Sequence, residues 1–242
     1  MIRADLHIHT VLSPCGDLEM TPLNIIKKAR ERSLGIIGIT DHNSTLQCGE
    51  IRRIGEREGI SVLCGAEITT KEEVHVVCLV DTDKLATLQE YLNKYLPPVP
   101  NKTDFFGYQL VVNEDEEVLY QEPYLLISAI NQSINQVEAF IHSLGGLFIP
   151  AHIDKRQNSI LSQLGFFPPD LKADAVELSV NCNLQEFVKN NTFLAGRGII
   201  TSSDAHYPED IGSAYTLLNL DTPDSGEISF ENVKKAILKL AV

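Results

Sequence analysis

The sequence predicts one α/β domain of barrel type, and three observations support this fold class. Short apolar runs of strand length alternate along the chain with segments of helical period, and Gly or Pro stands at many of the junctions. The chain has 242 residues, of which 43% are hydrophobic, enough for one sizeable core. Regular alternation of buried strands with helices is typical of a parallel sheet with helical crossovers, and seven or eight such units favour a barrel.

The first part of the chain contains four predicted strands and three predicted helices. The strands are expected at residues 2–8, 36–39, 60–65 and 74–80. The helices are expected at residues 22–34, 45–58 and 84–96. Pro22 suits the first position of a helix, whereas Gly35 and Gly59 suit helix ends.

Residues 97 to about 133 interrupt this alternation. An apolar stretch at 106–112, an acidic turn at 113–117 and a second apolar stretch predict a hairpin-like insertion, which is either a lid or a plain surface excursion. Helices then follow at 137–144, 184–190 and 230–240, with strands at 147–151, 176–180, 198–203 and 214–220. The whole chain, 1–242, is expected to form a single domain.

Charge and cysteine content exclude several classes of protein. The formal net charge of −13 argues against general binding to nucleic acid or to anionic membranes. An anionic substrate remains possible, because bound metal ions reverse the local field. Five cysteines without a CxxC pair indicate a reduced, cytoplasmic protein. The N-terminus shows no signal-peptide segment, and no apolar run approaches the ~20 residues of a membrane span.

Six of the seven histidines lie at or beside a predicted strand end: His7, His9, His42, His75, His152 and His206. The seventh, His142, is expected on a helix surface. His7 and His9 alternate on one strand, so their side chains point to the same face and suit one divalent ion, although structural histidines also show this spacing. Asp5 points the same way and is expected to accept an imidazole N–H.

Carboxylates follow the predicted strand ends as well, namely Asp41, Glu67 and Asp204. Strand ends of a parallel barrel meet at one mouth, so these side chains are expected to join the histidines there. Each residue alone has a structural explanation such as helix capping, but the complete set favours a metal site. His75 precedes its strand, which places it at the opposite end unless an irregular turn brings it back.

Mixed imidazole and carboxylate ligands suit Zn, Mn or Fe rather than Ca or an all-oxygen Mg site. A carboxylate such as Glu67 is able to bridge two ions, and paired ions share a hydroxide and clamp phosphate oxygens. Lys155 and Arg156 follow His152 on the same predicted loop. Arg156 is expected to bind phosphate in bidentate fashion, the alternative being that both are solvated charges.

Five motifs resemble those of the polymerase and histidinol phosphatase (PHP) domain family. They are Asp5-Leu6-His7-Ile8-His9-Thr10, Thr40-Asp41-His42, Gly65-Ala66-Glu67, Pro150-Ala151-His152 and Ser203-Asp204-Ala205-His206. Their order spans residues 5–206, most of the chain. The resemblance implies a distorted (β/α)7 barrel with a trinuclear metal site, usually that of a phosphoesterase.

The resemblance also implies how two or three divalent ions share the ligands. The first ion would be held by His7, His9, Glu67 and Asp204. The second would share Glu67 and add His75 and His152. The third would take His42, His206 and a residue of the loop after the first strand, where many relatives have His or Asp. Here Cys15 stands at that position, with Asp17 as the alternative.

The predicted function is hydrolysis of a small phosphate monoester, such as a nucleotide or histidinol phosphate, with Asp204, His206 and Arg156 as catalytic residues. A phosphodiesterase or exonuclease is one alternative, restricted by the acidic charge to short oligonucleotides or nucleotides. An amidohydrolase-type enzyme also uses an HxH pair, but the ligands at Glu67, His42 and His206 favour the phosphoesterase. A metal-binding protein without catalysis is the remaining alternative.

Overall fold

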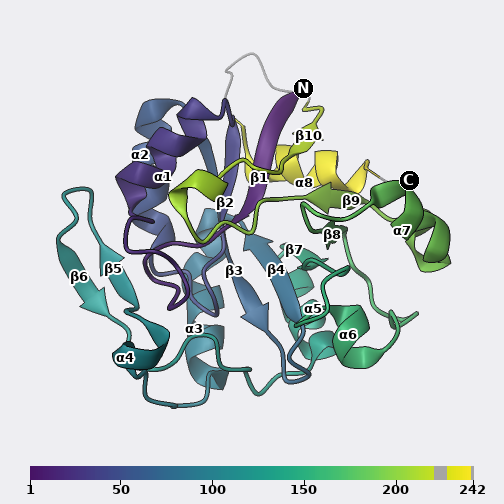
Figure 1. Ribbon diagram of the computed structural model, residues 1–242, viewed down its shortest axis with the longest axis horizontal. Coiled ribbons are helices and arrows are strands. Elements are labelled where there is room, and N and C mark those ends of the chain that lie inside the picture. The colour runs from purple at the N-terminus through teal and green to yellow at the C-terminus, as the bar shows by residue number, and fades with distance from the viewer. Residues whose placement is uncertain (221–227, 241–242) are drawn as a thin grey trace.

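The computed structural model describes residues 1–220 and 228–240 and shows a mixed α/β fold around one curled sheet (Figure 1). The strand order of this sheet is β10-β1-β2-β3-β4-β7. The strands are β1 Ile2–Ile8, β2 Ile36–Ile39, β3 Ser61–Thr69, β4 His75–Val80, β7 Leu147–Pro150 and β10 Thr216–Leu218. A separate parallel pair, β8 (Val176–Leu178) and β9 (Ile199–Thr201), lies next to β7.

Helices pack against the sheet through apolar side chains at helical spacing. They are α1 Pro22–Glu31, α2 Cys48–Glu58, α3 Leu85–Tyr95, α5 Ile134–Ser143, α6 Ile160–Leu164, α7 Leu184–Asn190 and α8 Phe230–Leu238. Short 3-10 turns lie at Thr82–Lys84, Thr192–Leu194 and Pro208–Asp210. Pro22 opens α1, and Gly59 ends α2 with φ +73°, as the sequence predicts. Among the described residues no helix is long and apolar enough to cross a membrane, and all five cysteines are free.

The main sheet is not wholly parallel, so the expectation of parallel pairing throughout is wrong. β1, β2 and β3 are parallel, but β4 runs antiparallel to both β3 and β7, and β10 runs antiparallel to β1. Residues 70–74 between β3 and β4 are too few for a helical crossover, so the chain folds back. Thr69 therefore pairs with His75, and the start of β4 lies at the carboxyl end of β3.

A few backbone hydrogen bonds join the β8–β9 pair and the segments beside it to both sides of the curled sheet. Ile153 N donates to Glu177 O at 2.9 Å, next to β7, and His9 N donates to Ala205 O at 3.0 Å, next to β1. The sheet therefore curls around the strand ends. Because these contacts are isolated and not ladders, the predicted number of seven βα units is not confirmed.

The insertion contains α4 (Thr103–Phe106) and a hairpin of β5 (Leu110–Val112) and β6 (Val118–Gln121). Buried amide side chains fasten it to the domain. Gln47 bonds both the N–H and the carbonyl of Val112, at 2.8 and 2.9 Å. Asn43 donates to the carbonyl of Leu126 at 2.7 Å. The insertion is thus attached to the segment that follows β2, which is also the segment that carries His42.

Candidate metal centre

The side chain of Glu67 stands at the centre of the histidine cluster and is 1% exposed. Its Oε1 atom lies close to ring nitrogens of His75 (2.9 Å), His152 (3.2 Å) and His7 (3.4 Å). Its Oε2 atom lies close to ring nitrogens of His42 (3.0 Å) and His9 (3.4 Å). Imidazole nitrogens therefore surround both oxygens of this one carboxylate, and a carboxylate with both oxygens so placed is able to serve more than one ion.

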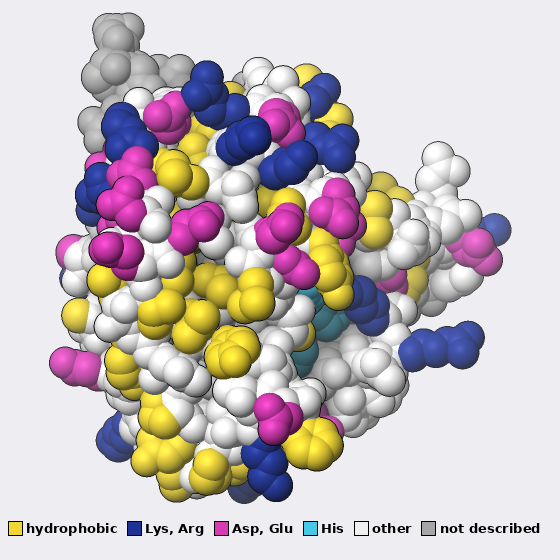
Figure 2. Space-filling view, turned by 60° about the vertical axis from the view of Figure 1, so that its left-hand side comes forward, with side chains coloured by type: hydrophobic (Ala, Val, Ile, Leu, Met, Phe, Trp, Pro, Cys, Tyr) yellow, Lys and Arg dark blue, Asp and Glu magenta, His cyan; other side chains and the backbone are white. Residues whose placement is uncertain are grey.

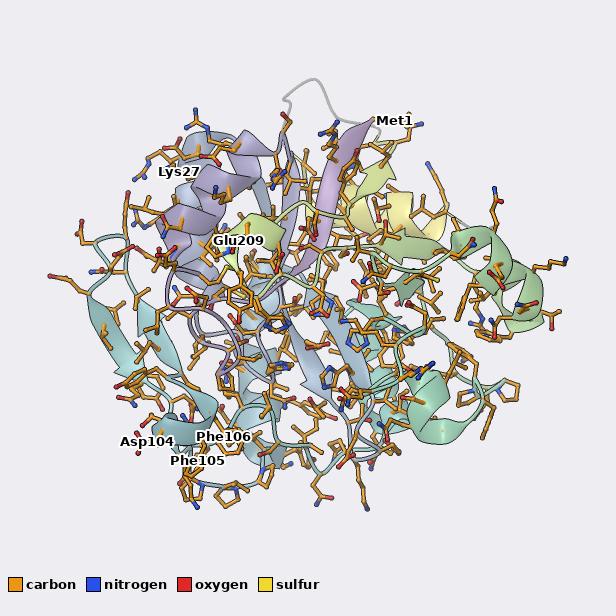
Figure 3. All side chains as sticks on the ribbon, viewed as in Figure 1. Met1, Lys27, Asp104, Phe105, Phe106 and Glu209 are labelled. Carbon is orange, nitrogen blue, oxygen red and sulfur yellow. The ribbon has the colours of Figure 1, made fainter. Side chains whose placement is uncertain are left out.

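The ends of several strands deliver these side chains to one place, as the sequence predicts. His7 lies in β1 and His9 follows it directly, His42 follows β2, and Glu67 lies within β3, which is longer than expected. His75 opens β4 beside Glu67, because β4 is reversed relative to the predicted parallel strand. Ring nitrogens gather in the middle of the molecule, whereas Phe105 and Phe106 of the insertion lie at its edge (Figure 3).

Loops with unusual backbone conformation carry further members of the cluster. His152 has φ +31°, Asp204 has φ +52°, and Asn43, next to His42, has φ +45°. A non-glycine residue in this left-handed region costs about 1–3 kcal/mol and persists where the surroundings enforce it. Its occurrence in three loops of one cluster indicates a geometry set by function.

Two groups of ligand atoms are compact enough to hold an ion. In each group the ligand atoms all lie within 4.8 Å of one another. The first consists of His7, His9, Glu67 and Asp204, the set expected for the first ion. The second consists of His42, Glu67 and His75; His152, which was expected beside His75, lies outside this group, with its Nε2 atom 3.2 Å from Glu67 Oε1. The two groups share Glu67.

The chemistry of the first group fits divalent cations. The Nε2 atoms of His7 and His9 lie 3.2 Å apart, and each lies 3.4 Å from Asp204 Oδ1. Nitrogen lone pairs and carboxylate oxygens directed at one point repel unless a proton or cation lies between them. In addition, His152 Nδ1 and His206 Nδ1 are buried without a hydrogen-bond partner among the described residues.

Opposing pKa shifts result from this crowding. Burial alone would lower the pKa of His7, but the carboxylates of Glu177, Asp204 and Glu67 outweigh it and raise that pKa well above its usual value. Burial would raise the pKa of Glu67, but the surrounding imidazoles lower it well below its usual value. Burial lowers the pKa of His9 well below its usual value, and the neighbouring His206 and His42 lower it further. Glu67 is therefore held as a carboxylate, the form that ligates a metal ion.

Cys15 lies beside His42 and His206, where a third-ion ligand is expected. Partial desolvation would raise the pKa of its thiol, but hydrogen bonds with His206 and His42 lower it from 9.0 to about 7. Burial opposes charge on His42, but Glu67 and the Cys15 sulfur raise the pKa of His42 to about 10. Asp17, the alternative, accepts a hydrogen bond from Glu19 N at 2.8 Å, and neither Cys15 nor Asp17 belongs to the two ligand groups.

Cationic side chains lie at the edge of the hollow that exposes the histidines (Figure 2). Lys155 Nζ contacts Asp204 Oδ2 at 2.5 Å. Arg156 is exposed on the same loop and has no ion pair among the described residues. Of the two cations predicted to meet phosphate, Lys155 is therefore the one in contact with a candidate ligand.

Several residues around the cluster differ from the expectation or were missed. Asp5 accepts no imidazole N–H, because its two oxygens accept the backbone N–H groups of Ser203 and Gly212, each at 2.9 Å. The carboxylate beside His7 Nδ1 is instead Glu177, at 3.0 Å. The sequence feature that could have revealed Glu177 is a charged residue between two apolar residues of a predicted buried strand.

His9, the second histidine of the HxH pair, has a different hydrogen-bond partner at its Nδ1 atom. His9 Nδ1 lies 3.0 Å from Ser13 Oγ, and the Ser13 hydroxyl donates to Asp41 Oδ1 at 2.7 Å. Asp41 also accepts the N–H and the hydroxyl of Thr10, at 2.7 and 2.8 Å. Asp41 therefore fixes the loop after β1 and orients His9 through a hydroxyl, a role that the sequence analysis did not assign.

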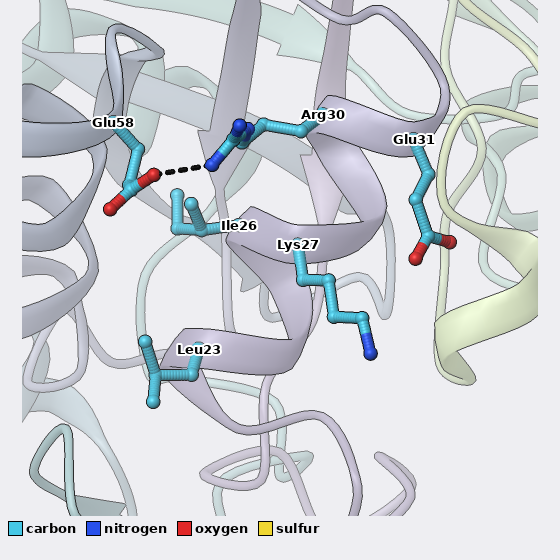
Figure 4. Close-up of a pocket in the computed structure, with 6 residues that line it drawn as sticks. All are labelled: Leu23, Ile26, Lys27, Arg30, Glu31 and Glu58. Carbon is cyan, nitrogen blue, oxygen red and sulfur yellow. Dashed lines mark hydrogen bonds and ion pairs between the residues drawn. The ribbon is translucent and has the colours of Figure 1, made fainter.

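A surface groove of about 490 Å³ lies between α1 and α2 (Figure 4). It is lined by Leu23, Ile26, Lys27, Arg30, Glu31 and Glu58. Arg30 and Glu58 form an ion pair across it at 2.5 Å. None of the candidate metal ligands lines this groove, so its shape does not bear on the metal centre.

By class, this is a mixed α/β domain in which strand ends around a curled sheet bring buried imidazoles and carboxylates together in a candidate metal centre. The particular family follows from comparison with known proteins. A family model described as the PHP domain matches residues 5–149, and a second, described as PHP-associated, matches residues 195–239. The chain belongs to the PHP family.

Two curated relatives match shorter segments. MJ1587 of Methanocaldococcus jannaschii, an uncharacterised protein, is 35% identical over 79 residues, which are 29% of this chain and 46% of that protein. The 3',5'-nucleoside bisphosphate phosphatase of Chromobacterium violaceum is 32% identical over 80 residues, 33% of this chain and 27% of that enzyme. The matches thus cover less than half the length of either relative.

Solved structures share the fold over nearly the whole chain. Endonuclease Q of Pyrococcus furiosus aligns with a TM-score of 0.65 at 18% identity, over 99% of this chain and 56% of that chain. A protein of Bifidobacterium adolescentis assigned as a metal-dependent phosphoesterase aligns with a TM-score of 0.59 at 18% identity, over 99% of this chain and 96% of that chain. At these identities the likeness shows the fold alone.

Proposed function

We propose that this protein is a metal-dependent phosphoesterase that hydrolyses a small phosphate monoester. The observation that carries the proposal is the position of Glu67, which belongs to both compact ligand groups. A carboxylate shared in this way would hold two cations side by side. The phosphatase and phosphoesterase names of PHP relatives support the same reaction class.

The proposed ligands serve two or three ions of Zn, Mn or Fe, which suit mixed nitrogen and oxygen donors. Divalent ions in such a site supply a nucleophile from water at neutral pH and neutralise phosphate oxygens. His7, His9, Glu67 and Asp204 would hold one ion. Glu67 with His75 and His152 would hold the second. His42, His206 and Cys15 would hold a third.

The chain's own residues would bind and orient the substrate. Lys155 stands against Asp204 at the mouth, so a phosphate that reaches the centre meets this ammonium group. Arg156, exposed on the same loop, is placed to bind a second phosphate oxygen as the substrate enters. Asp204, which Lys155 contacts, and His206, whose Nε2 atom lies 3.5 Å from Asp204 Oδ1, are proposed as catalytic residues with Arg156.

A small monoester is favoured over nucleic acid by charge. The net charge of −13 gives no general attraction for a polyanion, and the insertion adds an acidic turn with Glu114 and Asp115. Cleavage of nucleic acid is the second candidate, because endonuclease Q shares the fold. An amidohydrolase-type reaction shares the HxH pair, but the further candidate ligands at Glu67, His42 and His206 favour the phosphoesterase.

The proposal is tested with purified protein and Mn²⁺ on an aryl phosphate, an aryl phosphodiester, a single-stranded oligonucleotide and an amide. We expect turnover of the aryl phosphate, and its loss in Asp204→Ala and His152→Ala. Glu122→Gln, which changes a buried carboxylate of the insertion, serves as the control and should keep activity. Turnover of the oligonucleotide alone, or wild-type turnover in both site variants, overturns the proposal.

A further inference from the structure

One oxygen of a buried carboxylate outside both ligand groups contacts two members of the cluster. Glu177, on β8, is 1% exposed. Its Oε2 atom accepts hydrogen bonds from His7 Nδ1 at 3.0 Å and from the backbone N–H of His152 at 3.1 Å. The backbone carbonyl of Glu177 accepts the N–H of Ile153 at 2.9 Å, which holds the same loop against β8.

Both contacts act on histidines that face the same atom of Glu67. The Nε2 atoms of His7 and His152 lie 3.4 and 3.2 Å from Glu67 Oε1. A hydrogen bond at Nδ1 places the proton of a neutral imidazole there and leaves the Nε2 lone pair for a metal ion. For His152 the contact restrains the backbone instead, at a residue whose φ is +31°.

We propose that Glu177 is the positioning residue of this metal centre. It sets the Nδ1–H tautomer and ring orientation of His7 and holds the strained backbone of His152, so that both Nε2 atoms are directed at the Glu67 Oε1 side of the site. The inference rests on the proposed metal site and is independent of which ester the protein hydrolyses.

The chain contains a matched control three residues earlier. Asp174 Oδ2 accepts hydrogen bonds from His142 Nε2 at 3.0 Å and from the backbone N–H of Phe148, on β7, at 2.8 Å. This is the same pairing of one carboxylate oxygen with a ring nitrogen and a backbone N–H. Neither His142 nor Phe148 belongs to a ligand group. Asp174→Asn therefore makes the same change from carboxylate to amide at an equivalent structural contact away from the metal centre.

The experiment is calorimetric titration of Mn²⁺ into metal-free wild type, Glu177→Gln, Glu177→Ala and Asp174→Asn, with thermal unfolding of each metal-free protein. Mutation of a residue that hydrogen-bonds to a metal ligand typically lowers metal affinity about 10- to 100-fold. We expect a loss of that size for the tightest Mn²⁺ site in Glu177→Gln, and a larger loss in Glu177→Ala. Asp174→Asn should lower the unfolding temperature and keep the wild-type affinity.

Two outcomes overturn the inference: wild-type Mn²⁺ affinity in Glu177→Gln, or an equal loss of affinity in Asp174→Asn, which would trace the effect to stability. Glu177→Gln keeps the side-chain shape and one acceptor oxygen, so it gives a result even if Glu177→Ala does not fold. A wild type that binds Mn²⁺ but hydrolyses no phosphate ester would refute the proposed function and leave the role of Glu177 standing.

Discussion

Lys155 and Asp204 form an ion pair in which Asp204 uses the oxygen that the metal group leaves free. Lys155 Nζ lies 2.5 Å from Asp204 Oδ2, whereas Asp204 Oδ1 lies 3.4 Å from both His7 Nε2 and His9 Nε2. Burial would lower the pKa of Lys155, but the Asp204 carboxylate raises it, so the ammonium stays charged at neutral pH. One carboxylate thus connects the candidate ligands to a cation at the mouth.

Lys155→Met should lower kcat/KM for an aryl phosphate about 10- to 100-fold, the equivalent of about 1.5–3 kcal/mol for a hydrogen bond to a charged group. The loss should appear mainly in KM, because the ammonium binds the incoming phosphate. Arg156→Gln should have a smaller effect, since Arg156 has no contact with a candidate ligand among the described residues. Steady-state kinetics of both variants decide this, and unchanged kinetics in Lys155→Met would contradict it.

Glu67→Gln should remove at least one bound metal ion per chain and abolish hydrolysis. An amide has one acceptor oxygen and carries no charge, so it cannot bridge the two ligand groups that share Glu67. Metal content measured by mass spectrometry after dialysis checks this, with Glu122→Gln as the control. A full metal complement in Glu67→Gln would show that the two groups do not depend on a shared carboxylate.

The Cys15 thiol should react faster with iodoacetamide than the Cys182 thiol in metal-free protein. Hydrogen bonds with His206 and His42 lower the pKa of Cys15 to about 7, whereas burial and Asp154 raise the pKa of Cys182 to about 11. Zn²⁺ should then protect Cys15, because a coordinated sulfur is not free to react. Peptide mass spectrometry measures both rates. Equal Cys15 rates with and without Zn²⁺ would exclude Cys15 as a ligand.

Glu114→Gln should lower the thermal stability slightly at pH 7, and this difference from wild type should disappear in acid. Hydrogen bonds from Arg57 and Arg53 depress the pKa of Glu114 from 4.5 to about 2. A depressed carboxyl pKa stabilises the fold above the unfolded value and loses that effect as pH falls from about 4.5 toward 2. Unfolding temperatures of wild type and variant across this range test it, with Asp115→Asn as a control in the same turn. A difference that stays constant with pH would contradict it.

Much of the candidate site is readable from local sequence. Period-two spacing puts His7 and His9 on one face of β1, and short apolar runs before His42, His152 and His206 mark strand ends. Hydrophobic periodicity reports which residues are buried, but not the direction of a strand. For that reason the reversal of β4, and with it the place of His75, was not predicted.

Sequence alone determined the kind of chemistry, because ligand types and strand ends are properties of short segments. Tertiary structure decided which groups meet. It paired Glu177 with His7 and His152, turned Asp5 toward Ser203 and Gly212, and set Lys155 against Asp204. These contacts join residues 25 to 207 positions apart, and such separations are fixed by how strands and loops pack, which local patterns do not encode.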